Sequence, residues 1–111
     1  MKRNFSTKVI CYKKNNKFLA VALDFDLLDE GNCIGEALAK LEENIISYLR
    51  MCIKENENDK NIYRKAPKKY YDLYELFIEL QKKHEEKNKN KFLGELSFNR
   101  ENLDKHTCCN S

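Results

Sequence analysis

The chain has 111 residues, of which 41% are hydrophobic and 35% are charged. This length allows one domain with a modest core plus an appendage, because a chain of this size buries only about two-thirds of its unfolded surface. The 21 basic and 18 acidic side chains leave a formal net charge of +3, which is too small to indicate a nucleic-acid-binding surface, and no stretch approaches the ~20 apolar residues of a membrane span.

The first part of the chain predicts two or three strands. Residues 5–12, FSTKVICY, are β-branched and aromatic and favour a strand. A polar break at 13–16 contains two asparagines, which tolerate the left-handed backbone of a tight turn, and the apolar run 17–23 follows it. These segments predict a β-hairpin. Residues 27–30 predict a short third strand that ends at Gly31.

The strongest periodic signal lies in residues 34–53. Apolar side chains recur there at steps of three and four, the pattern of a helix with one buried face: Ile34, Ala37, Leu38, Leu41, Ile45, Leu49, Cys52 and Ile53. Asn32 or Cys33 caps its start, and Glu36 lies where a capping box places its glutamate. We therefore predict an α+β fold in which a small antiparallel sheet of three or four strands carries a long helix on one face.

The second half predicts a loop, a short strand and a C-terminal helix. Residues 56–61 are polar and predict the loop, and Ile62-Tyr63-Arg64 suggest one more short strand. Pro67 then opens a helix expected over 68–86, because proline is tolerated in the first helical turn.

The helix over 68–86 is rich in aromatic residues. Its apolar stripe is broad: Tyr70, Leu73, Tyr74, Leu76, Phe77, Ile78, Leu80 and His84. Such a stripe must pack on the domain, on a second copy or on a partner. Tyr70, Tyr74 and Phe77 are the candidate partner-binding residues. The chain thus divides into a sheet-plus-helix domain at 1–65 and a C-terminal region at 66–111.

The end of the chain holds a small apolar cluster followed by a polar tail. Phe92, Leu93, Leu96 and Phe98 can dock locally, whereas residues 99–111 are expected to be frayed.

Acidic side chains are densest at the end of the hairpin, where Asp24, Asp26, Asp29 and Glu30 lie close in sequence. Close carboxylates can bind a divalent ion or act as acid and base. No EF-hand glycine pattern accompanies them, and we interpret them as solubilising loop charge.

The cysteines are odd in number and form no C-x-x-C pair: Cys11, Cys33, Cys52, Cys108 and Cys109. His106, Cys108 and Cys109 are adjacent soft ligands, but three such neighbours cannot easily surround one ion. We therefore predict no metal site, no cofactor and no catalytic residue. Polar residues at 6–8 break the apolar run of a signal peptide, so we expect a reduced, cytoplasmic protein in which Cys11 and Cys52 fill the core.

Lysines near the start of the second helix mix with aromatic residues, as nucleic-acid-binding surfaces do. Lys65, Lys68 and Lys69 precede Tyr70 and Tyr71. Acidic residues follow at once and cancel their field: Asp72, Glu75 and Glu79. We interpret the segment as the solvated start of a helix.

Three segments together follow a known family pattern. They are Val9-Ile10-Cys11-Tyr12, then Phe18-Leu19-Ala20-Val21-Ala22-Leu23-Asp24 after the turn, and then Gly31-Asn32-Cys33-Ile34-Gly35-Glu36-Ala37-Leu38 ahead of a helix with Leu41 and Ile45. The run from Val9 to about Leu49 resembles the HicB-like antitoxin domain. Gly31 and the Glu36-Ala37 pair match the family pattern in position, whereas Cys33 replaces the usual hydroxyl residue at the cap.

The resemblance implies a truncated ribonuclease-H-like fold without a nuclease active site. It also implies a protein that binds and inhibits a small, basic, RNA-cleaving toxin and that forms dimers or higher oligomers. Antitoxins of this kind usually end in a DNA-binding motif, but the second helix of a ribbon-helix-helix is not evident in 87–99, and we do not favour DNA binding. Two alternatives stay open: a stand-alone homo-oligomer of the same fold without a toxin, and an enzyme that uses Asp24 and Asp26.

Overall fold

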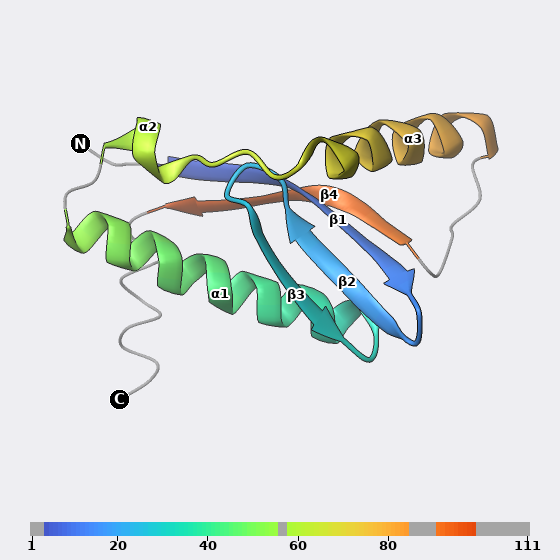
Figure 1. Ribbon diagram of the computed structural model, residues 1–111, viewed down its shortest axis with the longest axis horizontal. Helices are drawn as coiled ribbons and strands as arrows, with labels where there is room; N and C mark the ends of the chain where they lie inside the picture. Colours follow the sequence, from blue (N-terminus) through green and yellow to red (C-terminus); the bar gives the residue numbers. More distant parts are fainter. Residues whose placement is uncertain (1–3, 56–57, 85–90, 100–111) are drawn as a thin grey trace.

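Four antiparallel strands and two long helices make up the structure, a computed structural model that describes residues 4–55, 58–84 and 91–99. The elements are β1 (Asn4–Lys14), β2 (Lys17–Ala22), β3 (Leu27–Gly31), α1 (Ile34–Lys54), α2 (Asp59–Ile62), α3 (Lys68–His84) and β4 (Lys91–Asn99). The strands form one sheet in the order β3-β2-β1-β4, with every neighbouring pair antiparallel (Figure 1). The predicted α+β fold is confirmed.

The first two strands form the predicted hairpin. They are joined through Asn15, whose φ of 58° is left-handed, a conformation that asparagine adopts more readily than most residues. The register sets Val9 opposite Ala22. Because side chains alternate along a strand, β1 buries two sets of residues on its two faces, with Val9 and Cys11 on the side of α1 and Ile10 on the side of α3.

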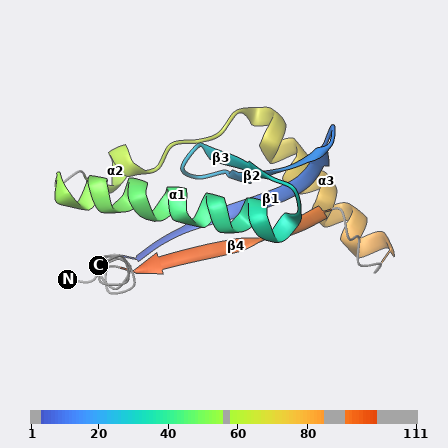
Figure 2. The ribbon, with the colours of Figure 1, turned by 90° about the horizontal axis from the view of Figure 1, so that it is seen from below.

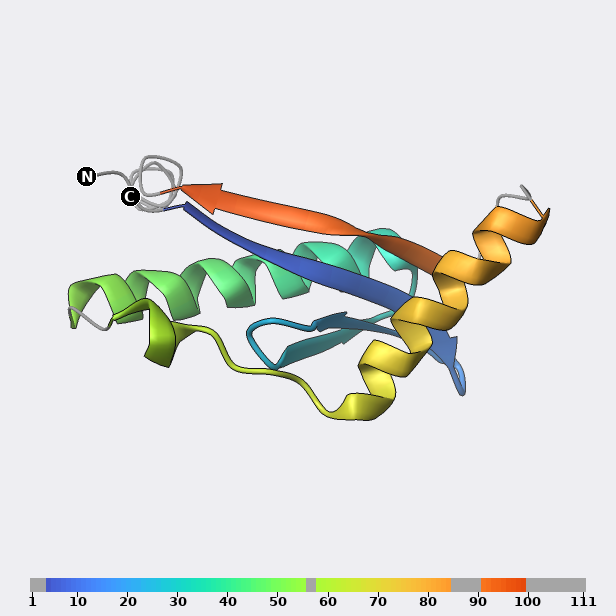
Figure 3. The same cartoon turned by 90° about the horizontal axis from the view of Figure 1, so that it is seen from above.

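Helices cover both faces of the sheet: α1 is the long helix predicted on one face, and α3, whose packing the sequence left open, covers the other. Figures 2 and 3 show α1 and α3 on opposite sides of the strands. Leu41, Ile45 and Leu49 of α1 are fully buried in the core on one face. Phe77 of α3 belongs to a separate core on the other face. Each large side chain buried in this way contributes roughly 1.5–3 kcal/mol.

The fourth strand is not the one suggested by the sequence, because Ile62-Tyr63-Arg64 do not form a strand. The chain makes the short helix α2, which ends at Ile62. The side-chain oxygen of Asn58 accepts the N–H of Asn61 at 3.2 Å, a capping bond that favours a helical turn over an extended segment. The fourth strand is β4, which pairs with β1 along its whole length.

The apolar cluster at 92–98 lies within β4. Phe92, Leu96 and Phe98 pack on the α1 side of the sheet, and Leu93 packs on the α3 side. Asn99 is the last residue of β4 and lies opposite Asn4; the rest of the predicted frayed end, residues 100–111, lies outside the described residues.

Elements of both predicted regions, 1–65 and 66–111, share one sheet, because β4 pairs with β1. The helix predicted over 68–86 is α3, whose described part ends at His84. Among the residues that the structure describes, no helix is long and apolar enough to cross a membrane.

Candidate partner-binding surface

The three candidate partner-binding residues lie on the side of α3 that faces the sheet. Tyr70 and Phe77 are each only 6% exposed and pack in the core formed with β1 and β2. Tyr74 is half-buried, and the ammonium group of Lys8 lies 5.5 Å from the centre of its ring. The structure therefore brings the three residues together, but as contacts within the chain. Direct partner binding by these residues stays a prediction.

Backbone and hydroxyl hydrogen bonds hold the start of α3 against the loop that follows β2. The N–H of Ala66 donates to the carbonyl oxygen of Leu23 at 2.9 Å, and the Tyr71 hydroxyl donates to the same oxygen at 2.6 Å. The N–H of Arg64 donates to the carbonyl oxygen of Asp24 at 2.8 Å. Burial, followed by the nearby charge of Asp24, raises the pKa of Tyr71, so this hydroxyl stays protonated and able to donate at neutral pH.

The middle of α3 is held by aromatic contacts. The Phe77 and Tyr12 rings form an edge-to-face pair with a centroid distance of 6.2 Å and an interplanar angle of 68°, a geometry that aromatic pairs prefer. The Lys91 ammonium group lies 4.8 Å from the centre of the Phe77 ring. These contacts set the rotation of α3 about its own axis, and that rotation decides which residues face away from the sheet.

The opposite side of α3 carries an exposed acidic and apolar surface, which we call the outer strip. It consists of Asp72, Glu75, Leu76 and Glu79, all of which are exposed, and the exposed Lys68 and Lys82 lie on the same face beyond its two ends. Their spacing of three, four and seven residues places them on one face of the helix. Leu76 is 47% exposed, which is high for a large apolar side chain. It lies beside the three carboxylates.

The sequence reasoning missed the outer strip. The apolar stripe predicted for this helix includes Leu76, and the sequence pattern presents the three acidic residues only as charges that cancel the field of the preceding lysines. A signal was nevertheless present, because Leu76 lies four residues after Asp72 and one after Glu75. A helical projection places it among those carboxylates and away from Phe77.

Asp24 and Asp26 lie in the loop between β2 and β3 and stabilise it, whereas Asp29 and Glu30 lie in β3. A side-chain oxygen of Asp24 accepts the N–H of Lys8 at 2.9 Å, and the Asp24 N–H donates to the Thr7 hydroxyl oxygen at 3.0 Å. Asp26 adopts a left-handed φ of 52° in the turn. Within the described residues, no group of three or more histidine, cysteine or acidic side chains is arranged to hold a metal ion. His106, Cys108 and Cys109 lie outside those residues.

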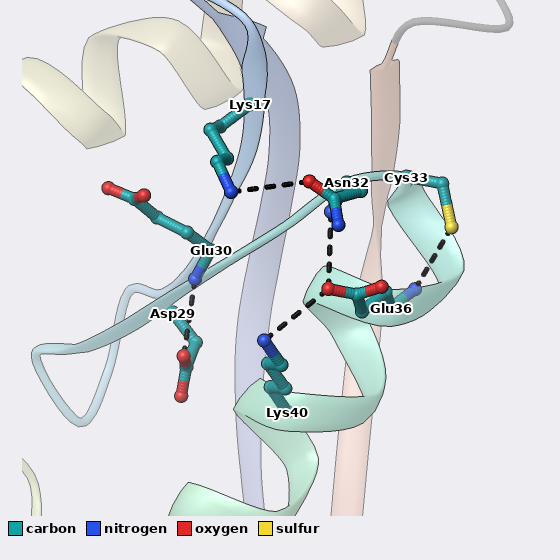
Figure 4. Close-up of polar contacts among 7 residues, drawn as sticks. All are labelled: Lys17, Asp29, Glu30, Asn32, Cys33, Glu36 and Lys40. Carbon is teal, nitrogen blue, oxygen red and sulfur yellow. Dashed lines mark hydrogen bonds and ion pairs between the residues drawn. The ribbon is translucent and has the colours of Figure 1, made fainter.

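The segment between β3 and α1 contains the residues that were expected to cap the start of α1 (Figure 4). The Cys33 sulfur accepts the N–H of Glu36 at 3.4 Å, and a Glu36 carboxylate oxygen accepts the N–H of Asn32 at 3.3 Å. The thiol thus takes the position of the usual hydroxyl cap, and α1 begins at Ile34. Glu36 also lies 3.3 Å from the Lys40 ammonium group.

Gly31 is required where β3 meets α1. A side-chain carbon at this position would lie 2.5 Å from the backbone nitrogen of Ala37, closer than any real contact of this kind. The two backbones therefore approach only because Gly31 has no side chain.

The three described cysteines are free thiols in two kinds of environment. Cys11 and Cys52 are buried in the core beside α1, as predicted, whereas Cys33 is exposed. Burial, with a smaller contribution from nearby Cys33, raises the pKa of Cys11 to about 11. Cys11 is therefore an inert core thiol at neutral pH.

No family model, no curated protein and no solved structure matches this chain. The resemblance to the HicB-like domain therefore rests on the residues of the chain alone.

Proposed function

We propose that the chain is a non-catalytic protein-binding module resembling a HicB-type antitoxin, and that it binds and neutralises a small, basic, RNA-cleaving toxin. The resemblance over residues 9–49 implies an antiparallel sheet carrying a long helix, and the observed architecture agrees with that implication. The observation that carries the proposal is the outer strip of α3, an acidic and apolar face on a chain of net positive charge.

The outer strip suits a basic partner for two reasons. Its three carboxylates are complementary to lysine or arginine side chains, and such complementarity speeds association and selects the partner. Leu76 supplies an apolar contact among them, as in complexes where one helix face lies in a groove of the partner. Tyr70 and Phe77 hold the helix on the sheet from its other side, which keeps the strip in one orientation.

Two features support a binding role over an enzymatic one or DNA binding. The Asp24 carboxylate, the main candidate for acid–base chemistry, accepts a backbone N–H of β1 and thereby stabilises the loop. The carboxylates of the outer strip repel the phosphates of DNA, so the middle of α3 is not suited to lie on a duplex.

The proposal is tested by capture and then by inhibition. The tagged chain is isolated from its native cell and co-purifying proteins are identified by mass spectrometry. We expect to recover a small basic protein in stoichiometric amount. This protein should cleave RNA when it is purified alone, and its RNA cleavage should stop when the chain is added back at equal concentration. A captured protein whose RNA cleavage is unchanged by the chain, or no stoichiometric partner at all, contradicts the proposal.

Charge reversal then locates the binding face. The double variant Glu75→Lys/Glu79→Lys is expected to weaken binding at least about tenfold, because the strip would repel a basic partner. Glu42→Lys/Glu43→Lys is the matched control, since both glutamates are exposed on α1 and the change in charge is the same. Equal affinities of the two double variants place the binding face elsewhere.

A further inference from the structure

The outermost strand β4 has an open edge. In the described part of the chain, β1 pairs with one side of β4 and no strand pairs with the other. The opposite edge of the sheet, β3, is only five residues long and carries Asp29 and Glu30, charges of the kind that discourage edge-to-edge pairing. At nine residues with two charged side chains, β4 is the longer and less protected edge.

The hydrogen bonds of β1 determine which groups of β4 point outward. Leu23 donates its N–H to the carbonyl oxygen of Lys8, so the backbone N–H and C=O groups of Lys8 point towards β2. The direction of the backbone N–H and C=O groups alternates from one residue to the next along an antiparallel strand. The backbone groups of Val9 therefore point towards β4, where the register partner of Val9 is Gly94. The N–H and C=O groups that face the open edge therefore belong to the alternate residues Leu93, Glu95 and Ser97.

Apolar side chains also reach this edge. Phe92 and Leu96 lie on the α1 side of β4 and are only partly buried. Figure 2 shows α1 crossing the other strands while β4 lies beyond it. A strand placed beside β4 would shield these two side chains from water as well as bond the open backbone groups.

We propose that β4 pairs antiparallel with β4 of a second copy, about a two-fold axis at Leu93, to form one continuous eight-stranded sheet. This register places Lys91 directly opposite Glu95 of the partner subunit, and by symmetry it does so twice. Both residues lie on the α3 side of the strand, because side chains alternate and Leu93 faces α3. A register centred on Glu95 would instead set two glutamates against each other, which is unfavourable.

A charge exchange tests this pairing by sedimentation velocity at low salt. The unmodified chain is expected to dimerise. Glu95→Lys should raise the dimer dissociation constant about tenfold or more, because it creates two Lys–Lys pairs. Lys91→Glu/Glu95→Lys should restore dimerisation, since each pair is again of opposite charge. Glu43→Lys on α1 is the control of equal charge change, and circular dichroism confirms that each variant is folded.

Hydrogen exchange provides a second readout that does not depend on charge. The amides of Leu93 and Glu95 should exchange more slowly at concentrations where the dimer forms, whereas those of Phe92 and Gly94, which face β1, should be protected in both states. A monomer at the highest soluble concentration overturns the inference. So does a dimer in which Glu95→Lys has no effect and the Leu93 and Glu95 amides exchange as fast as in the monomer. Neither measurement uses a toxin, so the outcome is independent of the proposed function.

Discussion

Two glycines near the start of α1 are expected to respond in opposite ways to the same added methyl group. Gly31→Ala should lower the free energy of unfolding by about 1–3 kcal/mol, because the new carbon would meet the backbone of Ala37 and force the two segments apart. Gly35→Ala is the matched control: nothing lies within 4 Å of its added carbon, and alanine should stabilise the helix by about 0.5–1 kcal/mol. Urea unfolding of both variants measures the difference, and equal effects would contradict the close approach at Gly31.

The buried thiol of Cys11 is expected to lower the free energy of unfolding at alkaline pH. Its pKa rises from 9.0 to about 11 on folding, so the folded state holds this proton more tightly than the unfolded state. The resulting stability is fully present below pH 9 and is lost as pH rises from 9 towards 11. We expect the free energy of unfolding to fall over this range and to fall less steeply in Cys11→Ala. Denaturant titrations at a series of pH values measure both slopes, and identical slopes would show that Cys11 does not titrate on unfolding.

At the scale of elements, the decisive contact is that between α3 and the sheet. Phe77→Ala should destabilise the protein by about 3–5 kcal/mol, since the ring is buried against Tyr12. Leu76→Ala, one residue earlier on the exposed side, should change stability by less than about 0.5 kcal/mol. Thermal or urea unfolding compares the two. A small effect of Phe77→Ala would mean that α3 is not docked on the sheet in solution, and that its apolar stripe is free for a partner.

At the scale of the whole molecule, we expect the two predicted regions to depend on each other for stability. A fragment of residues 1–65 would lack both β4 and α3, which leaves one side of β1 unpaired and uncovers Ile10, Leu19 and Val21. We expect this fragment to be less stable than the full chain, to bind hydrophobic dyes and to aggregate, whereas the full chain should unfold in one cooperative transition. Circular dichroism and light scattering test this. A soluble, cooperatively folded fragment would instead support 1–65 as an independent domain.

The sequence predicted the parts of the fold that rest on local patterns. The hairpin followed from two apolar runs around Asn15 and Asn16, and α1 followed from a stripe that repeats over five turns. Strand β4 was missed because Gly94, Glu95 and Ser97 interrupt its apolar pattern. More than seventy residues separate β4 from its partner β1. No local signal in the sequence shows which strand will pair with the free edge of β1.

The candidate site was predicted less well, for the same reason. The aromatic stripe of α3 indicated a buried face but left three choices for what covers it. The sheet proved to be the cover for Tyr70 and Phe77. Once that side is occupied, Leu76 and its acidic neighbours become the surface that a partner can reach.

The sequence by itself determined the fold class, the hairpin, the long helix and a capped start at Asn32 or Cys33. Each of these depends on side-chain periodicity or on hydrogen bonds between residues close in the chain. Only the tertiary structure decided that β4 completes the sheet, that α3 covers its second face and that the outer strip faces solvent. These features depend on which apolar surfaces meet across long sequence separations, and a hydrophobic pattern shows that a face must be buried without showing what buries it.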